Sequence, residues 1–398
     1  MDIFDKYATI IGRHDQVLEA GTDPFAVRVE EMLSATEAMV GGRRTILLGT
    51  NNYLGLTFDQ SAIDASIEAV RQAGTGTTGS RIANGTYAQH QEFEHELAAF
   101  LKRRSCMVFT TGYQANLAMI AGVAGPRDVI FMDSDSHASI YDGCTLSGAK
   151  VIRFRHNDPD DLDRRLARST EGECKLIIVE GLYSMLGDTA PLKAFAEVKK
   201  KHGAWLMVDE AHSLGVYGKE GRGLAEAQDC EADVDFVVGT FSKSLAAIGG
   251  FGAANHPRFD CLRFCSRPYM FTASPSPASI ASARASLRRM AEDSSLRTSI
   301  WNNAERLHAG LRQLGYVVAS APGPVAAIRL KDETTAVTAW NRLLGLGVYV
   351  NLALPPGTPA GACLLRCSVS AAHTPAQIDE VLGRFELLAQ SLRELATA

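Results

Sequence analysis

The stretch Gly239-Thr240-Phe241-Ser242-Lys243-Ser244 follows an apolar run at residues 234–238 and leads into small residues at 246–250. A lysine buried at the end of a strand costs free energy unless its amine has a partner or a covalent role. The small neighbouring side chains leave room for a bulky group. We therefore interpret Lys243 as a Schiff-base lysine for pyridoxal 5′-phosphate (PLP), with the Thr240 and Ser242 hydroxyls donating to the phosphate. A surface lysine after a strand is the alternative.

Short apolar runs recur on both sides of this stretch. They cover residues 106–109, 129–132, 151–154, 176–179, 205–208, 236–238 and 251–254. Helical patterns separate several of them, including residues 159–168 and 192–201. Short continuous apolar runs are typical of strands buried on both faces of a sheet. The pattern predicts an α/β fold with a mostly parallel sheet, in which ligands collect at the carboxyl ends of the strands.

Acidic and imidazole side chains follow one of these runs. Asp209 comes directly after residues 205–208, and His212 follows it in the sequence D-E-A-H. A metal pair would need a third ligand nearby, and a helicase box would need a phosphate-binding loop upstream, which this sequence lacks. Lys243 follows Asp209 by 34 residues, about one strand–helix–strand unit. Asp209 is therefore predicted to keep the pyridine nitrogen of PLP protonated from a neighbouring strand end.

Other strand ends carry further candidates. Gly112 and Tyr113 precede a helix start, whose backbone N–H groups suit a phosphate, although an ordinary turn is also allowed. His137 is either a structural histidine or a flat ring laid on a cofactor. Ser184 lies in a loop after residues 176–179 and could face a ligand.

Two candidates for substrate binding lie far apart in the chain. Asn51 and Asn52 form an Asn-rich turn, whose amides either satisfy the turn or face a ligand carboxylate. Arg366 follows an apolar run and is either structural or a carboxylate ligand.

Composition limits the classes of function. The chain has 398 residues and a formal net charge of -5 without a basic block, which disfavours nucleic-acid binding. No apolar run approaches about 20 residues, as a membrane-spanning helix requires. The N-terminus has an acidic residue at position 2 and no signal-peptide pattern, so we expect a cytoplasmic protein. The eight cysteines include no C-x-x-C pair, so we expect reduced thiols and no metal site.

The sequence suggests three parts. Residues 1–50 are predicted as an N-terminal arm with a helix at 25–39, residues 51–275 as a large cofactor-binding domain, and residues 276–398 as a smaller α+β domain. In the last part, residues 325–330 and 348–350 are predicted strands, and residues 335–344 and 375–392 are predicted helices.

Together the motifs resemble those of the α-oxoamine synthases, PLP enzymes with the aspartate-aminotransferase-like fold (fold type I). The motifs are N-N-Y-L-G-L, T-G-Y-x-A-N, D-S-H-A-S-I-Y-D-G, E-G-x-Y-S-M-L-G-D, D-E-A-H-S-L-G, G-T-F-S-K-S and R-C-S-x-S-x-x-H-T. They occur in the family's order from about residue 20 to the C-terminus. Within the family, G-S-R-x-x-N-G-T, R-F-R-H-N and R-P-Y-x-F-T-A-S resemble the bacterial branch that acylates serine. The implied fold is a mostly parallel seven-stranded sheet with a smaller α+β C-terminal domain.

The resemblance implies roles around the cofactor. Lys243 would hold PLP and move the substrate Cα proton, Asp209 would pair with the pyridine nitrogen, and His137 would stack on the ring. His212 and Ser184 would lie near the phenolic oxygen of the ring. The contacts to the phosphate and ring edge would come from Gly112, Tyr113, Thr240 and Ser242.

It also implies partners. Thr272 and Ala273 would reach the cofactor phosphate of a partner subunit, giving a homodimer with shared active sites. The Asn51–Asn52 pair and Arg366 match positions that bind the amino-acid carboxylate, with the choice between the two amides open. A long acyl chain would also allow peripheral contact with a membrane.

The implied reaction is a decarboxylating Claisen condensation of serine with a long-chain acyl-CoA such as palmitoyl-CoA. A sibling synthase that uses glycine, alanine or an acyl-carrier-protein thioester is the alternative. Leu354 departs from an arginine found in some relatives, and Thr78 from an asparagine. Both positions bear on substrate preference.

Overall fold

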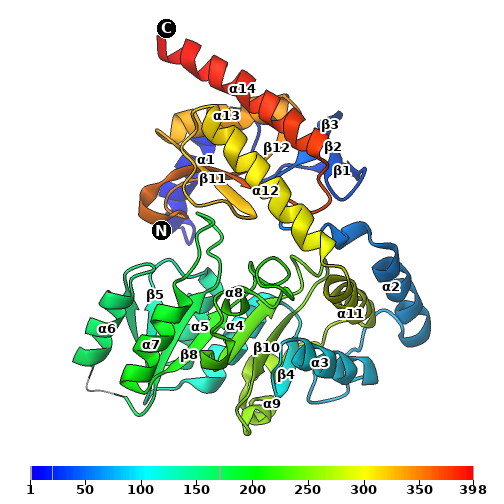
Figure 1. Ribbon diagram of the computed structural model, residues 1–398, viewed down its shortest axis with the longest axis vertical. Coiled ribbons are helices and arrows are strands. Elements are labelled where there is room, and N and C mark those ends of the chain that lie inside the picture. The colour runs from blue at the N-terminus through cyan, green and yellow to red at the C-terminus, as the bar shows by residue number, and fades with distance from the viewer. Residues whose placement is uncertain (1, 20, 170–171, 398) are drawn as a thin grey trace. The chain divides into compact units, whose positions relative to one another are not determined.

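The computed structural model describes residues 2–19, 21–169 and 172–397 (Figure 1). Contact clustering divides the chain into two compact units. The larger unit spans residues 51–184 and 188–300, and the smaller one spans residues 1–50, 185–187 and 301–398. The three-part division expected from the sequence stays a prediction.

The larger unit is built around a seven-stranded sheet with the order β4-β10-β9-β8-β7-β5-β6. Its strands are β4 (Ser105–Phe109), β5 (Val129–Asp133), β6 (Lys150–Phe154), β7 (Lys175–Glu180), β8 (Trp205–Asp209), β9 (Phe236–Thr240) and β10 (Gly250–Ala254). All neighbours are parallel except β10, which runs antiparallel to both β4 and β9. The predicted mostly parallel seven-stranded sheet is confirmed.

Helices cover both faces of this sheet. They are α2 (Gln60–Ala73), α3 (Ala88–Phe100), α4 (Gly112–Val123), α5 (Ala138–Ser147), α6 (Pro159–Arg168), α7 (Leu192–His202), α8 (Leu224–Ala227), α9 (Leu262–Cys265), α10 (Arg267–Met270) and α11 (Pro277–Glu292), with 3₁₀ turns at Leu56–Phe58, Glu231–Asp233 and Phe259–Cys261. Successive strand residues point to opposite faces, so Phe131 of β5 joins one apolar cluster and Ile130 joins the other. The first cluster includes residues of α3, α6, α7 and α11, and the second includes residues of α4, α5 and α10. Figure 1 also shows α11 beside α2 and α3.

Burial on both faces explains why most of the strands are continuously apolar. The edge strand β6 is the exception, because most of its residues are exposed or half-buried.

The smaller unit contains two sheets, with the orders β1-β2-β3-β12 and β11-β14-β13. Its elements are a 3₁₀ turn (Asp5–Tyr7), α1 (Ala8–Glu19), β1 (Val29–Met32), β2 (Glu37–Val40), β3 (Arg43–Leu47), β11 (Val325–Leu330), α13 (Glu333–Gly345), β12 (Val348–Tyr349), β13 (Asn351–Ala353), a 3₁₀ turn (Pro359–Gly361), β14 (Cys363–Ser368) and α14 (Pro375–Thr397). Helix α12 (Ser295–Gln313) crosses the division between the units. None of the described helices is long and apolar enough to cross a membrane.

The predicted helix at residues 25–39 is wrong, because this segment contributes β1 and β2 of a hairpin. The N–H groups of Leu33 and Ser34 both donate to the carbonyl of Glu37 and close the turn. Ala38 and Val40, two residues apart, are buried against Leu47 of β3. A spacing of two is the period of a strand, and pairing with β3 decides the conformation.

Candidate active site

Lys243 lies in a closed turn directly after β9. The N–H of Ala246 donates to the carbonyl of Lys243 at 3.0 Å, and the N–H of Phe241 donates to the carbonyl of Gly249 at 2.9 Å. The ring of Phe241 is fully buried beside Phe93, with ring centroids 5.0 Å apart. The turn that carries the half-buried lysine is therefore anchored in the core of the sheet.

A small cradle faces the same turn. Gly112 begins α4, and a Cβ added there would lie 2.7 Å from Cβ of Thr240, so only glycine allows this approach. The Thr240 hydroxyl donates to the carbonyl of Gly249 at 3.0 Å and lies 2.8 Å from the Ser242 hydroxyl. Free N–H groups at a helix start, together with two hydroxyls, form a site for a phosphate.

Asp209 ends β8 and is 5% exposed. Its Oδ2 accepts from Nδ2 of Asn116 at 2.7 Å, and its Oδ1 accepts from the N–H of Ala211 at 2.9 Å. Asn116 Nδ2 also donates to the Ser139 hydroxyl at 2.9 Å, which lies 2.7 Å from Nδ1 of His137. A hydrogen-bonded chain thus connects the buried carboxylate to the histidine.

These contacts determine the tautomer of His137. Nδ1 accepts from the backbone N–H of Ser139 at 3.2 Å, so the proton of the neutral ring lies on Nε2. Burial lowers the pKa of His137, the charge of Asp209 raises it, and the charge of Lys243 lowers it, with a net decrease. The ring is therefore neutral at pH 7, with Nε2–H available as a donor.

His212 is buried three residues after the end of β8. Its Nδ1 lies 2.7 Å from the hydroxyl of Tyr53, a fully buried side chain. The Tyr53 hydroxyl also lies 3.4 Å from Oδ1 of Asn51. The neighbouring Asn52 donates from Nδ2 to the Thr57 hydroxyl at 2.8 Å. The Asn-rich turn and the D-E-A-H segment therefore meet through Tyr53.

Tyr113, predicted at the ring edge, and Thr272 and Ala273, predicted at a partner subunit's cofactor phosphate, have hydrogen-bond partners in or near α4 and α5. Tyr113 donates its hydroxyl to Asp142, and its ring lies edge-on to His137 at 6.2 Å. Thr272 accepts from Nε2 of Gln114 at 3.2 Å, and the carbonyl of Ala273 accepts from the Thr110 hydroxyl at 2.6 Å. Ser184 is half-buried in the loop after β7.

All predicted site residues except Arg366 belong to the larger unit. Arg366 belongs to β14 of the smaller unit, where it is 5% exposed and donates from Nη1 to the Ser368 hydroxyl at 2.8 Å. Its approach to the site stays a prediction.

Several residues of this site were not among the predicted ones. Asn116, Ser139 and Tyr53 orient Asp209, His137 and His212, and the Glu180 carboxylate accepts the backbone N–H of His137 at 2.5 Å. Burial and the neighbouring charge of Asp209 raise the pKa of Glu180 well above its usual range. One signal was available for Asn116: it follows Gly112 by four positions and so lies on the same helix face.

These residues fit PLP. A phosphate suits the cradle that only glycine permits at position 112, and Asp209 can accept a hydrogen bond from a pyridinium N–H, because a carboxylate has about four acceptor positions. The positive charge of Lys243 lowers the pKa of both His137 and Glu180.

The fold and this set of residues define a PLP-dependent enzyme of fold type I. A family model described as aminotransferase class I and II matches residues 43–385, and the chain belongs to this family.

Bacterial serine palmitoyltransferases are similar to this chain over nearly its whole length. The protein of that name from Caulobacter vibrioides (strain NA1000 / CB15N) is 55% identical, over 97% of this chain and 96% of its own. A solved structure of the Sphingomonas wittichii protein has a TM-score of 0.96 at 49% identity, over 98% of this chain and 99% of its own. A serine palmitoyltransferase from S. paucimobilis was solved with a bound PLP–myriocin aldimine. It has a TM-score of 0.96 at 47% identity, over 98% of this chain and 99% of its own.

Proposed function

We propose that this chain condenses L-serine with a long-chain acyl-CoA such as palmitoyl-CoA. The products are 3-ketodihydrosphingosine, CoA and carbon dioxide, which is the first step of sphingolipid synthesis. The observation that carries the proposal is the connected set of Lys243, Asp209, Asn116, Ser139 and His137 within one unit.

The chain's own residues would hold and move protons at defined atoms. When bound, PLP supplies an electron sink that stabilises the carbanion formed at Cα of the amino acid. Lys243 would hold the cofactor and afterwards take the Cα proton on Nζ. Asp209 would keep the proton on the pyridine nitrogen, and Asn116 holds that carboxylate in place.

The other residues would bind and orient. His137 would present Nε2–H to the substrate from a ring fixed by Ser139. Gly112, Tyr113, Thr240 and Ser242 would bind the phosphate and the ring edge, and His212 and Ser184 the phenolic oxygen. Asn51, Asn52 and Arg366 would bind the carboxylate of the amino acid.

A homodimer with shared sites is part of the proposal, with Thr272 and Ala273 reaching the partner's cofactor phosphate. Large apolar side chains beside this segment support it, because Phe271 is 77% exposed and Phe264 is 71% exposed. We also propose that the enzyme works in the cytoplasm and touches membranes only peripherally. The cysteines of the chain are all free thiols, in keeping with a reducing compartment.

The test is a panel of serine, glycine and alanine against acyl-CoA donors of different chain length, scored by release of free thiol. Serine with a C16 donor should give the highest kcat/KM. A preference for glycine or alanine would refute the assignment, and a preference for an acyl-carrier-protein donor would correct the second substrate. Lys243→Ala serves as the control and should lose the borohydride-reducible cofactor.

A further inference from the structure

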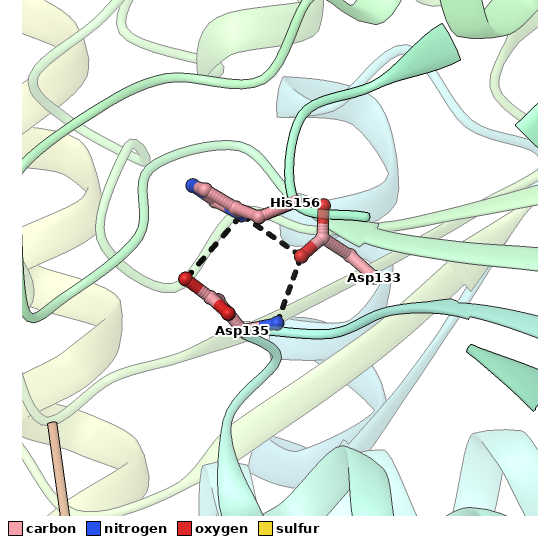
Figure 2. A group of neighbouring side chains, drawn as sticks. All are labelled: Asp133, Asp135 and His156. Carbon is pink, nitrogen blue, oxygen red and sulfur yellow. Dashed lines mark hydrogen bonds and ion pairs between the residues drawn. The ribbon is translucent and has the colours of Figure 1, made fainter. Parts of the chain in front are cut away.

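His156 lies two residues after β6, and both of its ring nitrogens meet carboxylates. Nδ1 lies 2.9 Å from Oδ1 of Asp133, and Nε2 lies 2.6 Å from Oδ2 of Asp188. Oδ2 of Asp135 is 3.9 Å from Nδ1. Figure 2 shows the ring with Asp133 and Asp135 grouped around it.

Two such hydrogen bonds require a proton on each nitrogen. A carboxylate only accepts, and a neutral imidazole has one N–H, so the ring that satisfies both contacts is an imidazolium. Burial lowers the pKa of His156, but the hydrogen bonds to Asp133 and Asp188 outweigh burial and raise the pKa to about 10. Two uncharged groups also meet the ring: Tyr183 lies edge-on with the centroids 4.5 Å apart, and Nδ2 of Asn157 lies 3.2 Å from Nε2. The two protons of that amide have acceptors in Asp188 Oδ2 and the carbonyl of Thr189, so Nε2 need not accept from it.

Asp133, Asp135 and His156 also have the spacing of a metal site. The hydrogen bonds argue against that use, because the ring nitrogen that would bind the ion already points its proton at Asp133. We assign the positive charge of this cluster to the imidazolium.

The carboxylates that hold His156 also fix the chain that leads to the active site. Oδ1 of Asp133 accepts the N–H of Asp135, and Oδ2 accepts the N–H of Asn157, each at 2.9 Å. Two residues beyond Asp135, the N–H of His137 donates to Glu180. The segment between β5 and His137 is therefore tied at both ends.

Asp188 closes the loop that carries Ser184. Its carbonyl accepts the N–H of Tyr183 at 2.9 Å, and its Oδ2 accepts from Nδ2 of Asn157 at 2.9 Å. Asn157 also donates to the carbonyl of Thr189 at 3.2 Å. The end of β6 thus holds the loop after β5 and the loop after β7 through one charged ring.

We propose that His156 is a positioning residue, whose imidazolium joins Asp133 to Asp188 and so sets the positions of His137 and Ser184. The proposal rests on the proposed function, because it assigns His156 an effect on that reaction. Removing the ring should displace both loops, and a displacement of about 1 Å near reacting groups lowers the rate by about 100-fold.

The first test reads the protonation state of the His156 ring directly. In the holoenzyme labelled with ¹⁵N at histidine, long-range ¹H–¹⁵N spectra at pH 8 should contain a ring protonated on both nitrogens. That signal should be absent in His156→Gln and present in His202→Gln. His202 is a matched control, because its Nε2 lies 2.7 Å from Oδ1 of Asp163 on the surface helices α6 and α7. A neutral His156 ring at pH 8 would overturn the proposal.

The second test measures kcat per PLP-loaded site at 25 °C. His156→Gln should lower kcat by about 10- to 100-fold with the cofactor content retained, whereas His202→Gln should stay within about 2-fold. Full kcat in His156→Gln would reduce the cluster to a merely structural role and refute the proposal. If His156→Gln does not fold, Asp188→Asn replaces it and should lower kcat in the same way.

The two readouts separate this proposal from the proposed function. Should serine prove the wrong substrate, the protonation state of His156 in the first test still stands. Should the wild-type enzyme turn over serine while His156 is neutral, the positioning role fails alone.

Discussion

The loop after β5 and the loop after β6 each carry a histidine, and their surroundings shift the pKa values of the two rings in opposite directions. In β5 and β6, which pair in parallel, Asp133 lies opposite Phe154, so both loops leave the same edge of the sheet. His137 meets a backbone N–H and a hydroxyl, and its pKa is lowered. His156 meets two carboxylates, and its pKa is raised to about 10. Burial lowers the pKa of both rings, and only at His156 do hydrogen bonds to carboxylates outweigh burial.

The largest expected effect comes from replacing Asp209, the carboxylate that is linked to His137 through hydrogen bonds. Asp209→Asn keeps the shape and the contact with Asn116 but cannot hold a proton on a pyridine nitrogen. We expect kcat/KM to fall on the order of 10³-fold, as for other losses of a fixed charge at a reacting centre. The measurement is thiol release by the PLP-loaded variant. Asp163→Asn, which changes a half-buried carboxylate of α6 that pairs with Lys201 and His202, should retain activity, and an equal loss there would contradict the assignment.

A smaller effect is expected from the neutral ring itself. His137→Asn removes Nε2–H while keeping a polar side chain at the start of α5. Loss of one positioned donor or proton carrier typically costs about 10²-fold in rate, and we expect this for kcat/KM. Steady-state kinetics with the PLP content measured in parallel test this. Activity unchanged within a factor of about two would remove His137 from the site.

The charge on the His156 ring should make the free energy of unfolding depend on pH. His156 has a folded-state pKa of about 10, above the usual value near 6.5, so its contribution is complete below about pH 6.5. It is lost progressively as pH rises and is gone above about pH 10. We expect it to be worth roughly 2–4 kcal/mol at neutral pH.

Urea unfolding of wild type and His156→Gln at pH 6.5, 8.5 and 10 measures this difference. The gap between the two proteins should narrow as pH rises. A gap that stays constant would mean that the ring is not charged in the folded state.

The smallest effect concerns the hydroxyl beside His137. Ser139→Ala removes a donor to Nδ1, which stabilises the neutral ring, so the pKa of His137 should rise toward its usual value. On the acid side of the pH profile, kcat/KM falls as His137 becomes protonated below pH 6.5. The apparent pKa of this fall should increase by about 0.5–1 pH unit. An unchanged limb would show that Ser139 does not donate to the ring.

The sequence predicted those parts of the fold that depend on local pattern. Each of the seven apolar runs became a strand of the large sheet, because burial on both faces leaves a continuous apolar signature. Strand order and the reversed direction of β10 depend on long-range pairing, which no local window contains. The hairpin at residues 29–40 was mistaken for a helix because its pairing with β3 outweighs its own pattern.

For the site, residues at or shortly after strand ends were the ones that local reasoning could find. Asp209 ends β8, Lys243 follows β9 by three residues, and His137 follows β5 by four. Asn116 is 93 residues from Asp209, and Tyr53 is 159 residues from His212, so their roles arise only when distant segments meet. His156 belongs to the R-F-R-H-N motif, yet its charge depends on Asp133 at the end of β5 and on Asp188 in the loop after β7.

The reversed strand β10 also has a consequence for how the chain is made. In the sheet, β4 pairs only with β10, whose residues follow it by more than a hundred positions. A Cβ added at Gly250 would lie 2.6 Å from Cα of Gly112, so β10 packs directly against the start of α4. The cradle at Gly112 is therefore complete only after β10 has joined the sheet. During synthesis the early strand and α4 must therefore wait until residue 254 has left the ribosome. If Gly112 and Thr240 hold the phosphate of PLP as proposed, cofactor capture is a late event in folding, and a nascent chain that stops before β10 has no complete site for PLP.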